Sequence, residues 1–192
     1  MTVRTALRAA LLAPALAFLA APALSADSFT LDSRHTFPSF EINHLGFSTM
    51  RGIFTVTTGG LTYDPVTHEG TASATIQTKS IFTGDVERDG HLSGEKFFNS
   101  EKFPTMSFKS DKFQLADDKP VAVAGQLTML GVTKPVTLQV KPTKCAERMD
   151  KAFVCGAVVT GDIHRSDWGL NAYVPFIGDD VHIQIEVEAM RK

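Results

Sequence analysis

The sequence is poor in Trp and Tyr and has few long hydrophobic runs. Of 192 residues, one is Trp and two are Tyr, whereas Phe occurs 14 times. A transmembrane β-barrel carries belts of Tyr and Trp at both membrane interfaces, so this composition disfavours that class. The longest apolar run, residues 9–20, is far shorter than the ~20 residues that a membrane-spanning helix needs. We therefore expect the remainder of the chain to be soluble.

The first 26 residues have the pattern of a secretory signal peptide. Arg4 and Arg8 form a basic start, residues 9–20 are apolar, and small residues follow at the expected cleavage site. We expect Ala26 or Asp27 to be the first mature residue. The sequence therefore predicts an exported protein.

Neither sign of charge is in strong excess. Removing residues 1–26 takes two of the 19 Lys and Arg residues and none of the 21 Asp and Glu residues, which leaves a net charge of about −4. A mildly acidic surface with scattered charges argues against nucleic acid or anionic lipid as a partner. The remaining length has no internal repeat or linker, so we expect one domain, residues 27–192.

Cysteine is scarce, with Cys145 and Cys155 as the only two. They lie symmetrically about AERMDKAFV, a segment that can hold the turn of a hairpin, so their sulfur atoms would face each other across two strands. Export to an oxidising compartment favours a disulfide between them. The alternative is a pair of reactive or metal-binding thiols, for which a CxxC spacing and a neighbouring His are missing.

Alternation of apolar and polar residues predicts β-strands. The clearest example is residues 181–189, where every second residue is Val, Ile or Ala and the residues between are polar. The pattern recurs in residues 72–76, 121–129 and 136–140, and a change of parity predicts a β-bulge at residues 110–111. About eight strands joined by turns indicate an all-β, antiparallel barrel or sandwich, and closure into a barrel would remove exposed edges.

Residues 80–110 interrupt this strand pattern. They contain a polar turn, a short helix-like segment and the pair Phe97 and Phe98 before alternation resumes. We expect Asp89 to cap the helix and Leu92, Phe97 and Phe98 to turn into one end of the barrel.

The many Phe side chains have two interpretations. Phe buries a large apolar area without a polar atom that needs a partner, so these rings can simply fill the core. An eight-stranded barrel, however, is just wide enough either to be filled by side chains or to hold one slender ligand. Both interpretations stay open on composition alone.

Five segments follow one another along the chain: LDSRHTFPSFEINHLGFSTMRGIF, SIFTGDVERDGHLSGEKFFNSEKFPTMSFKS, GQLTMLGVTKPVTLQV, HRSDWGL and DDVHIQIEVEA. Together they resemble the YceI-like family of periplasmic polyisoprenoid-binding proteins. The resemblance implies a lipocalin-like antiparallel barrel with one short helical segment and a periplasmic location. It also implies a long apolar pore that holds an isoprenoid tail of the quinone or polyprenyl type. The Cys145–Cys155 pair departs from the family pattern and affects no expected ligand contact.

Alternation and resemblance together predict which side chains contact the lipid. The expected contacts are Phe37, Phe40, Ile42, Phe54, Ala74, Phe82, His91, Leu92, Phe97, Phe98, Phe108, Leu127, Leu138, Trp168, Phe176 and Ile183. The charged residues of the matching segments, such as Arg88, Asp89 and Arg165, have ion pairs and caps as their favoured role. The alternative is that His91 or Arg165 meets the polar head of the ligand.

The sequence offers no clear catalytic or metal site. Its six His residues lack the spacing of zinc ligands, and we find no nucleophile elbow, glycine-rich phosphate loop or setting for a catalytic Cys. We expect a lipid-binding protein rather than an enzyme, with no cofactor besides the bound lipid. A homodimer stays open.

Two rival functions also stay open. An envelope enzyme acting on a lipidic substrate would be favoured if two of His35, His44, His91 and Asp89 converged at a pocket. A ligand-free stress-response or interaction module would be favoured by a fully packed interior.

Overall fold

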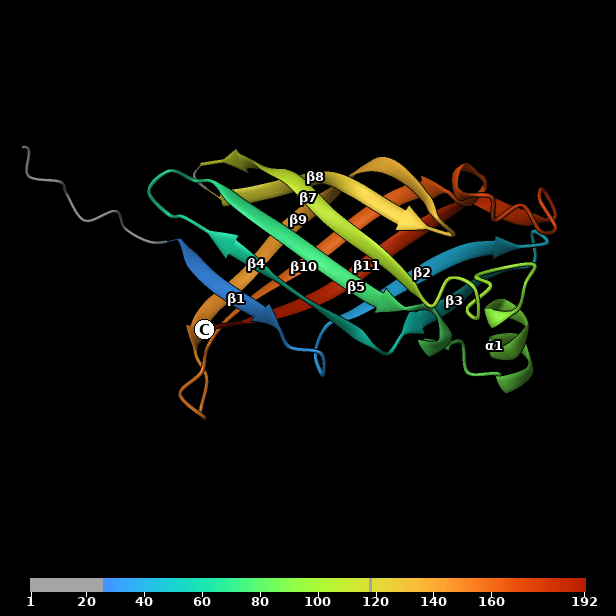
Figure 1. Cartoon of the computed structure of the whole chain (residues 1–192), viewed down its shortest axis with the longest axis horizontal. Coiled ribbons are helices and arrows are strands. Elements are labelled where there is room, and N and C mark those ends of the chain that lie inside the picture. Colours follow the sequence, from blue (N-terminus) through green and yellow to red (C-terminus); the bar gives the residue numbers. More distant parts are fainter. Residues whose placement is uncertain (1–25, 118) are drawn as a thin grey trace, which may run out of the picture.

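The structure is a computed structural model that describes residues 26–192, with the exception of residue 118 (Figure 1). The expected signal peptide therefore lies outside the described residues, apart from Ala26. The described part of the chain contains eleven strands, one α-helix and two short 3-10 helices, η1 (Thr78–Ser80) and η2 (Arg165–Trp168). Their bounds are β1 (Asp27–Leu31), β2 (Phe37–His44), β3 (Ser48–Phe54), β4 (Thr57–Tyr63), β5 (Gly70–Gln77), β6 (Ile81–Phe82), α1 (Val86–Ser93), β7 (Thr105–Ala116), β8 (Lys119–Met129), β9 (Val132–Glu147), β10 (Phe153–His164) and β11 (Ile177–Arg191).

The strands close into an antiparallel barrel. The ring runs β1-β4-β5-β7-β8-β9-β10-β11 and closes because β1 also pairs with β11. β2 pairs with the earlier part of β11, so β1 and β2 lie one after the other along the same neighbour. β3 pairs with β2, and the short β6 pairs with β3. The ring of eight strands confirms the barrel that the alternating pattern predicts.

The alternating pattern correctly predicts the inward faces. In β11, Val181 is buried, Ile183 and Ile185 are partly buried, and the intervening His182 and Gln184 are exposed. Between β7 and β8 the register shifts after Ser110, which confirms the expected bulge. Because each strand has a period of two, one face of every strand lines the interior of the barrel.

The helix α1 is capped one turn earlier in the sequence than we predicted. Asp85, not Asp89, is the N-cap, and its Oδ1 accepts a hydrogen bond of 2.8 Å from the Arg88 backbone N–H. Asp89 lies inside α1, where its Oδ1 accepts from the Thr83 backbone N–H at 2.8 Å and the Thr83 hydroxyl at 2.6 Å. The prediction of Asp89 as the cap was wrong, because its carboxylate fastens the preceding loop instead.

The hairpin between β9 and β10 carries the expected disulfide. Cys145 and Cys155 are register partners on the two strands and are joined by a bond between their sulfur atoms. The turn closes where the Arg148 N–H donates to the Ala152 carbonyl at 2.8 Å. Both cysteines are therefore used structurally.

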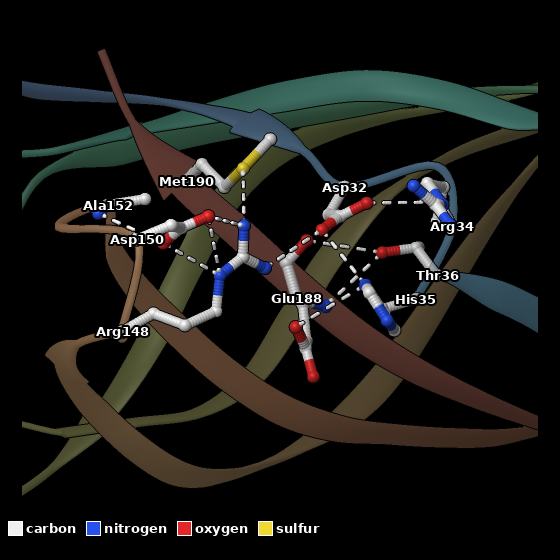
Figure 2. Close-up of polar contacts among 9 residues, drawn as sticks. All are labelled: Asp32, Arg34, His35, Thr36, Arg148, Asp150, Ala152, Glu188 and Met190. Atoms are coloured by element: carbon white, nitrogen blue, oxygen red, sulfur yellow. Dashed lines mark hydrogen bonds and ion pairs between the residues drawn. The ribbon is translucent and has the colours of Figure 1, made fainter.

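A polar cluster joins this hairpin to the loop between β1 and β2 and to the end of β11 (Figure 2). The Asp32 carboxylate accepts from the His35 ring at 2.9 Å and from the Arg148 guanidinium at 3.3 Å. The Thr36 hydroxyl donates to the Glu188 carbonyl and accepts from the Glu188 N–H, each at 3.2 Å. These bonds tie three segments together at the end of the barrel opposite α1.

Within the described residues, no helix is both long and apolar enough to cross a membrane. The helix α1 has eight residues.

The Asp32 cluster predicts a loss of stability in acid. The pKa of Asp32 lies below its usual 3.8, chiefly because the carboxylate accepts a hydrogen bond from His35. A carboxylate whose pKa is lowered by folding stabilises the fold above its unfolded pKa, and that stability is lost as the pH falls through the folded value. We expect Asp32→Asn to lower the free energy of unfolding at pH 7 by roughly 1.5–3 kcal/mol and to flatten its dependence on pH below about 4.

Urea unfolding between pH 2 and pH 7 measures both effects. The control is Asp27→Asn, since Asp27 makes an exposed ion pair with Arg191 at 3.4 Å and such pairs contribute little. If the free energy of unfolding depended on pH equally in Asp32→Asn and in the unmodified protein, the Asp32 cluster would not be the cause of the loss of stability in acid.

Candidate functional site

A long cavity of about 530 Å³ runs through the interior of the barrel. Side chains from β2, β3, β4, β5, β7, β8, β9, β10 and β11 line it, together with α1 and the residues after it. Its lining along β11 comprises Ile177, Val181, Ile183, Ile185 and Val187, so it extends over most of that strand. The volume lies in the range of small-molecule sites. The barrel is therefore hollow rather than filled.

Most of the predicted contacts lie on this cavity. The predicted residues on its lining are Phe40, Ile42, Phe54, Ala74, His91, Leu92, Phe97, Phe98, Phe108, Leu127, Leu138 and Ile183. They come from strands on all sides of the ring and from the segment around α1. The structure thus brings together twelve residues that are up to 143 positions apart in the sequence, Phe40 and Ile183 being the most distant.

Four predicted contacts lie elsewhere. Phe37, the first residue of β2, is partly buried and does not line the cavity. Phe82 and Phe176 are exposed to solvent. Trp168 is buried in the core next to the cavity, where its Nε1–H donates to the Leu127 carbonyl at 3.0 Å.

The lining also includes residues that the prediction left out. Leu61, Val159 and Ile185 face the cavity, as do Met50 and Tyr173. For Ile185 the signal was present, because it continues the alternation that contains Ile183. Tyr173 lies in a loop without a period, and no sequence pattern indicates its position.

Gly125 explains how the Phe108 ring fits into the wall. A Cβ atom at this position would lie 2.4 Å from the Lys109 carbonyl oxygen and 2.6 Å from Cζ of Phe108, closer than real Cβ atoms approach, so both the neighbouring strand and the ring need the glycine. Gly125 occupies an inward position of β8 opposite Ser110. The glycine that interrupts the alternation of β8 thus makes room for an aromatic ring.

The charged and imidazole groups of the lining gather at the end that carries α1. Thr83, Arg88 and His91 come from α1 and the loop before it, and His44 and Arg51 come from β2 and β3 beside it. His91 and Tyr173 both line the cavity and are exposed, so the mouth lies here. The opposite part of the lining, around Leu61, Phe113 and Val187, is apolar except for Thr36 and Ser73.

Residues 83–104, here called the plug segment, cover part of this mouth as expected. Phe98 meets Phe54 edge to face with ring centroids 5.3 Å apart, and Phe54 in turn lies 6.1 Å from Phe40. Leu92 and Phe97 pack against the same buried cluster, which includes Met106 and Met129. The aromatic chain connects the plug segment to the walls of the barrel.

Arg165 lies at the mouth but its guanidinium is committed to the backbone. It donates to the carbonyls of Gly178 at 2.8 Å, Ala172 at 2.9 Å and Ile177 at 3.0 Å, and also to that of Leu170. Burial lowers the pKa of Arg165 from its ordinary value. The interpretation of Arg165 as a structural residue therefore holds, and the loop after η2 (Arg165–Trp168) is organised around it.

The histidines expected as markers of an enzyme divide between the two ends of the barrel. His44 and His91 line the same mouth, whereas His35 lies in the Asp32 cluster at the other end. Asp89 bonds to Thr83 and does not line the cavity. Two of the four named residues therefore reach one pocket, and no hydrogen bond or ion pair joins them within the described residues.

One group in the described part of the chain has the composition of a metal-ligand set. Ligand atoms of Asp32, His35 and Glu188 all lie within 4.8 Å of one another. Arg148 approaches the same Asp32 carboxylate at 3.3 Å, so a protein cation already balances the negative charge there (Figure 2). The arrangement suits an ion-pair network better than a cation site.

The contact between Phe98 of the plug segment and Phe54 should stabilise the fold. Phe98→Ala removes the ring that contacts Phe54, and we expect the free energy of unfolding to fall by about 3 kcal/mol. Phe82→Ala is the matched control, because it removes the same ring from an exposed position nearby. Urea unfolding compares the two variants, and equal losses would show that the plug segment is an ordinary surface excursion.

Known proteins share this architecture. A model of the YceI-like domain matches residues 29–189. A UPF0312 protein of Serratia proteamaculans is 35% identical over 184 residues, which are 94% of this chain and 95% of the relative.

Solved structures agree with this match. The YCEI protein of Campylobacter jejuni superposes with a TM-score of 0.70 at 31% identity, over 78% of this chain and 90% of that one. A polyisoprenoid binding domain from Saccharophagus degradans shares the fold, with a TM-score of 0.67 at 16% identity over 85% of this chain and 98% of that domain. The family match covers nearly the whole described chain, so this protein belongs to the YceI-like family.

Proposed function

We propose that this protein binds a long-chain isoprenoid lipid, of the quinone or polyprenyl type, in the periplasm, and carries or sequesters it there. The observation that carries the proposal is a hollow, apolar barrel whose charged lining groups lie at one end. The Saccharophagus degradans domain with this fold is described as polyisoprenoid-binding, which supports the same ligand class. The signal-peptide pattern and the disulfide support an exported location.

The geometry favours one orientation of the ligand. The tail would lie among Ile183, Ile185 and Val187 toward the far end, and the polar head would stay near His44 and His91. Each methylene withdrawn from water contributes about 0.8 kcal/mol, so a long tail supplies most of the affinity without polar contacts. Selection would then act on length and slenderness, since bulky molecules do not fit.

One polar atom in the wall has a place in this proposal. The Thr57 side chain is only 1% exposed and lines the cavity, and its Oγ1 has no hydrogen-bond partner among the described residues. A buried hydroxyl without a partner is costly. The oxygen itself has almost no accessible surface, so the wall would have to shift before a bound molecule could donate a hydrogen bond to it.

The proposal assigns no catalysis to this protein. His44 and His91 share the mouth, but Asp89, the carboxylate nearest in sequence to His91, is occupied by Thr83. A general base needs an orienting partner and a substrate proton within hydrogen-bond reach. The hollow interior also argues against a ligand-free module, which would be expected to fill its core.

Native mass spectrometry tests the ligand class directly. We expect protein purified from its own periplasm, without detergent, to carry an added mass that tandem fragmentation identifies as a polyprenyl chain or a prenylated quinone. A phospholipid or a lipid-free protein that also refuses added polyprenol would contradict the proposal.

Ala74 provides a test of the path of the tail. Ala74 lines the cavity beside Phe108, its register partner on β7. We expect Ala74→Phe to fold but to lose at least tenfold in affinity for a polyprenol, because the new ring occupies the lumen. Thr75→Phe is the control, since Thr75 does not line the cavity and carries the same ring on the other face.

Fluorescence displacement with a labelled polyprenol measures both affinities, and circular dichroism checks the fold. Equal affinity of Ala74→Phe and Thr75→Phe would place the tail outside this cavity.

A further inference from the structure

Two uncharged segments stand side by side at the mouth of the barrel. Residues 45–50, LGFSTM, form the turn after β2 and the first residues of β3, and residues 169–178, GLNAYVPFIG, precede and begin β11. The Leu45 N–H donates to the Phe176 carbonyl at 3.0 Å, which holds the two segments together. Figure 1 shows both at the end that carries α1.

Large apolar side chains project from these segments into solvent. Phe47 is 89% exposed and Phe176 is 70% exposed, and Leu45 and Tyr173 are each about half exposed. We call these four residues the apolar rim. Soluble proteins rarely display such a cluster unless it meets a partner or a membrane.

The apolar rim continues into the cavity. The Tyr173 ring lines the cavity and lies 6.3 Å from the His91 ring and 6.1 Å from the Phe97 ring, measured between centroids. Ile177, next to Phe176, also lines the cavity. An apolar chain leaving the barrel would therefore pass directly from the lumen onto the rim.

We propose that the apolar rim docks on the surface of a lipid bilayer with neutral headgroups, so that an isoprenoid passes between bilayer and barrel without crossing water. This inference rests on the proposed function, since it concerns the same ligand. Each methylene exposed to water on the way would slow the transfer about fourfold. Aromatic side chains on uncharged loops suit the boundary between headgroups and acyl chains.

The charges around the rim are of both signs and give anionic lipid no advantage over neutral lipid. Neither rim segment contains Lys, Arg, Asp or Glu. Val86, also exposed at this end, lies between Asp85 and Glu87 at the start of α1. Arg51 and Arg88 lie at the same end, but Arg51 is paired with Glu41 and Arg88 bonds to Thr83, so attraction to the membrane must come from the apolar side chains.

Flotation with phosphatidylcholine vesicles tests the docking. We expect the protein to float with the vesicles and the double variant Phe47→Ser/Phe176→Ser to lose about 100-fold in partition, roughly tenfold for each ring removed. The matched control is Val66→Ser/Met149→Ser, which removes two exposed apolar residues from turns at the opposite end of the barrel. The control should float like the unmodified protein.

Transfer kinetics supply the second measurement. For the unmodified protein, the rate of polyprenol transfer from vesicles should rise in proportion to vesicle concentration. For the rim variant it should be slow and independent of that concentration. Equilibrium binding of a short, water-soluble prenyl alcohol should be equal in both, which shows that the rim variant is folded and its cavity intact.

Three results would overturn the proposal. One is a protein that does not float with vesicles while still binding the soluble prenyl alcohol, which leaves the proposed function standing. Another is that the unmodified protein sediments as a dimer and the rim variant as a monomer, which would show that the rim binds a second copy of the chain. The third is equal loss of flotation in the rim variant and the control. Failure of every prenyl compound to bind, with flotation retained, would reject the proposed function and the isoprenoid transfer that rests on it, and would leave only the docking of the rim on the bilayer.

Discussion

The pairing of β11 with three other strands is the constraint on which this structure depends. β11 pairs with β10 from Asp180 to Met190 and takes β2 and then β1 on its other side, which closes the ring. A slip of one residue would turn Val181 and Ile183 outward. Because the barrel is hollow, interior packing contributes less to the register than in a filled core. The disulfide and the Asp32 cluster, both at the far end, therefore add constraints that packing does not supply.

The mouth depends on a different constraint, the buried guanidinium of Arg165. Its four bonds to backbone carbonyls hold the chain between Leu170 and Gly178 as a shaped loop, whose own backbone bonds include the turn from the Ile177 N–H to the Tyr173 carbonyl. Asp179 adds to this arrangement, since its carboxylate accepts from both the N–H and the hydroxyl of Ser166, which lowers the pKa of Asp179. The polar groups of this end thus shape the opening, and His44 and His91 are left to face its contents.

The sequence predicts the walls of the barrel better than its ends. Strict alternation is a direct consequence of strand geometry, so the inward residues and the bulge at Ser110 could be read without a structure. The helix cap could not be decided, because Asp85 and Asp89 both precede possible turns and only the position of Thr83 distinguishes them. The contact of Arg148 with Asp32 spans 116 residues and has no local signal. Phe176 was predicted to contact the lipid because it is a large apolar residue. It lies in an irregular loop, where no alternating pattern distinguishes inward from outward side chains.

The even, almost featureless lining of the far half of the cavity has a consequence for timing. The walls around Leu61 and Val187 offer few polar atoms that could fix a bound chain at one position. A chain held there would therefore have no preferred depth and could slide along the axis of the barrel. Its dwell time would then follow the number of carbons inside, and with about 0.8 kcal/mol for each methylene, a chain longer by one methylene would stay about four times longer. The length of the bound chain would therefore set its rate of dissociation from the barrel.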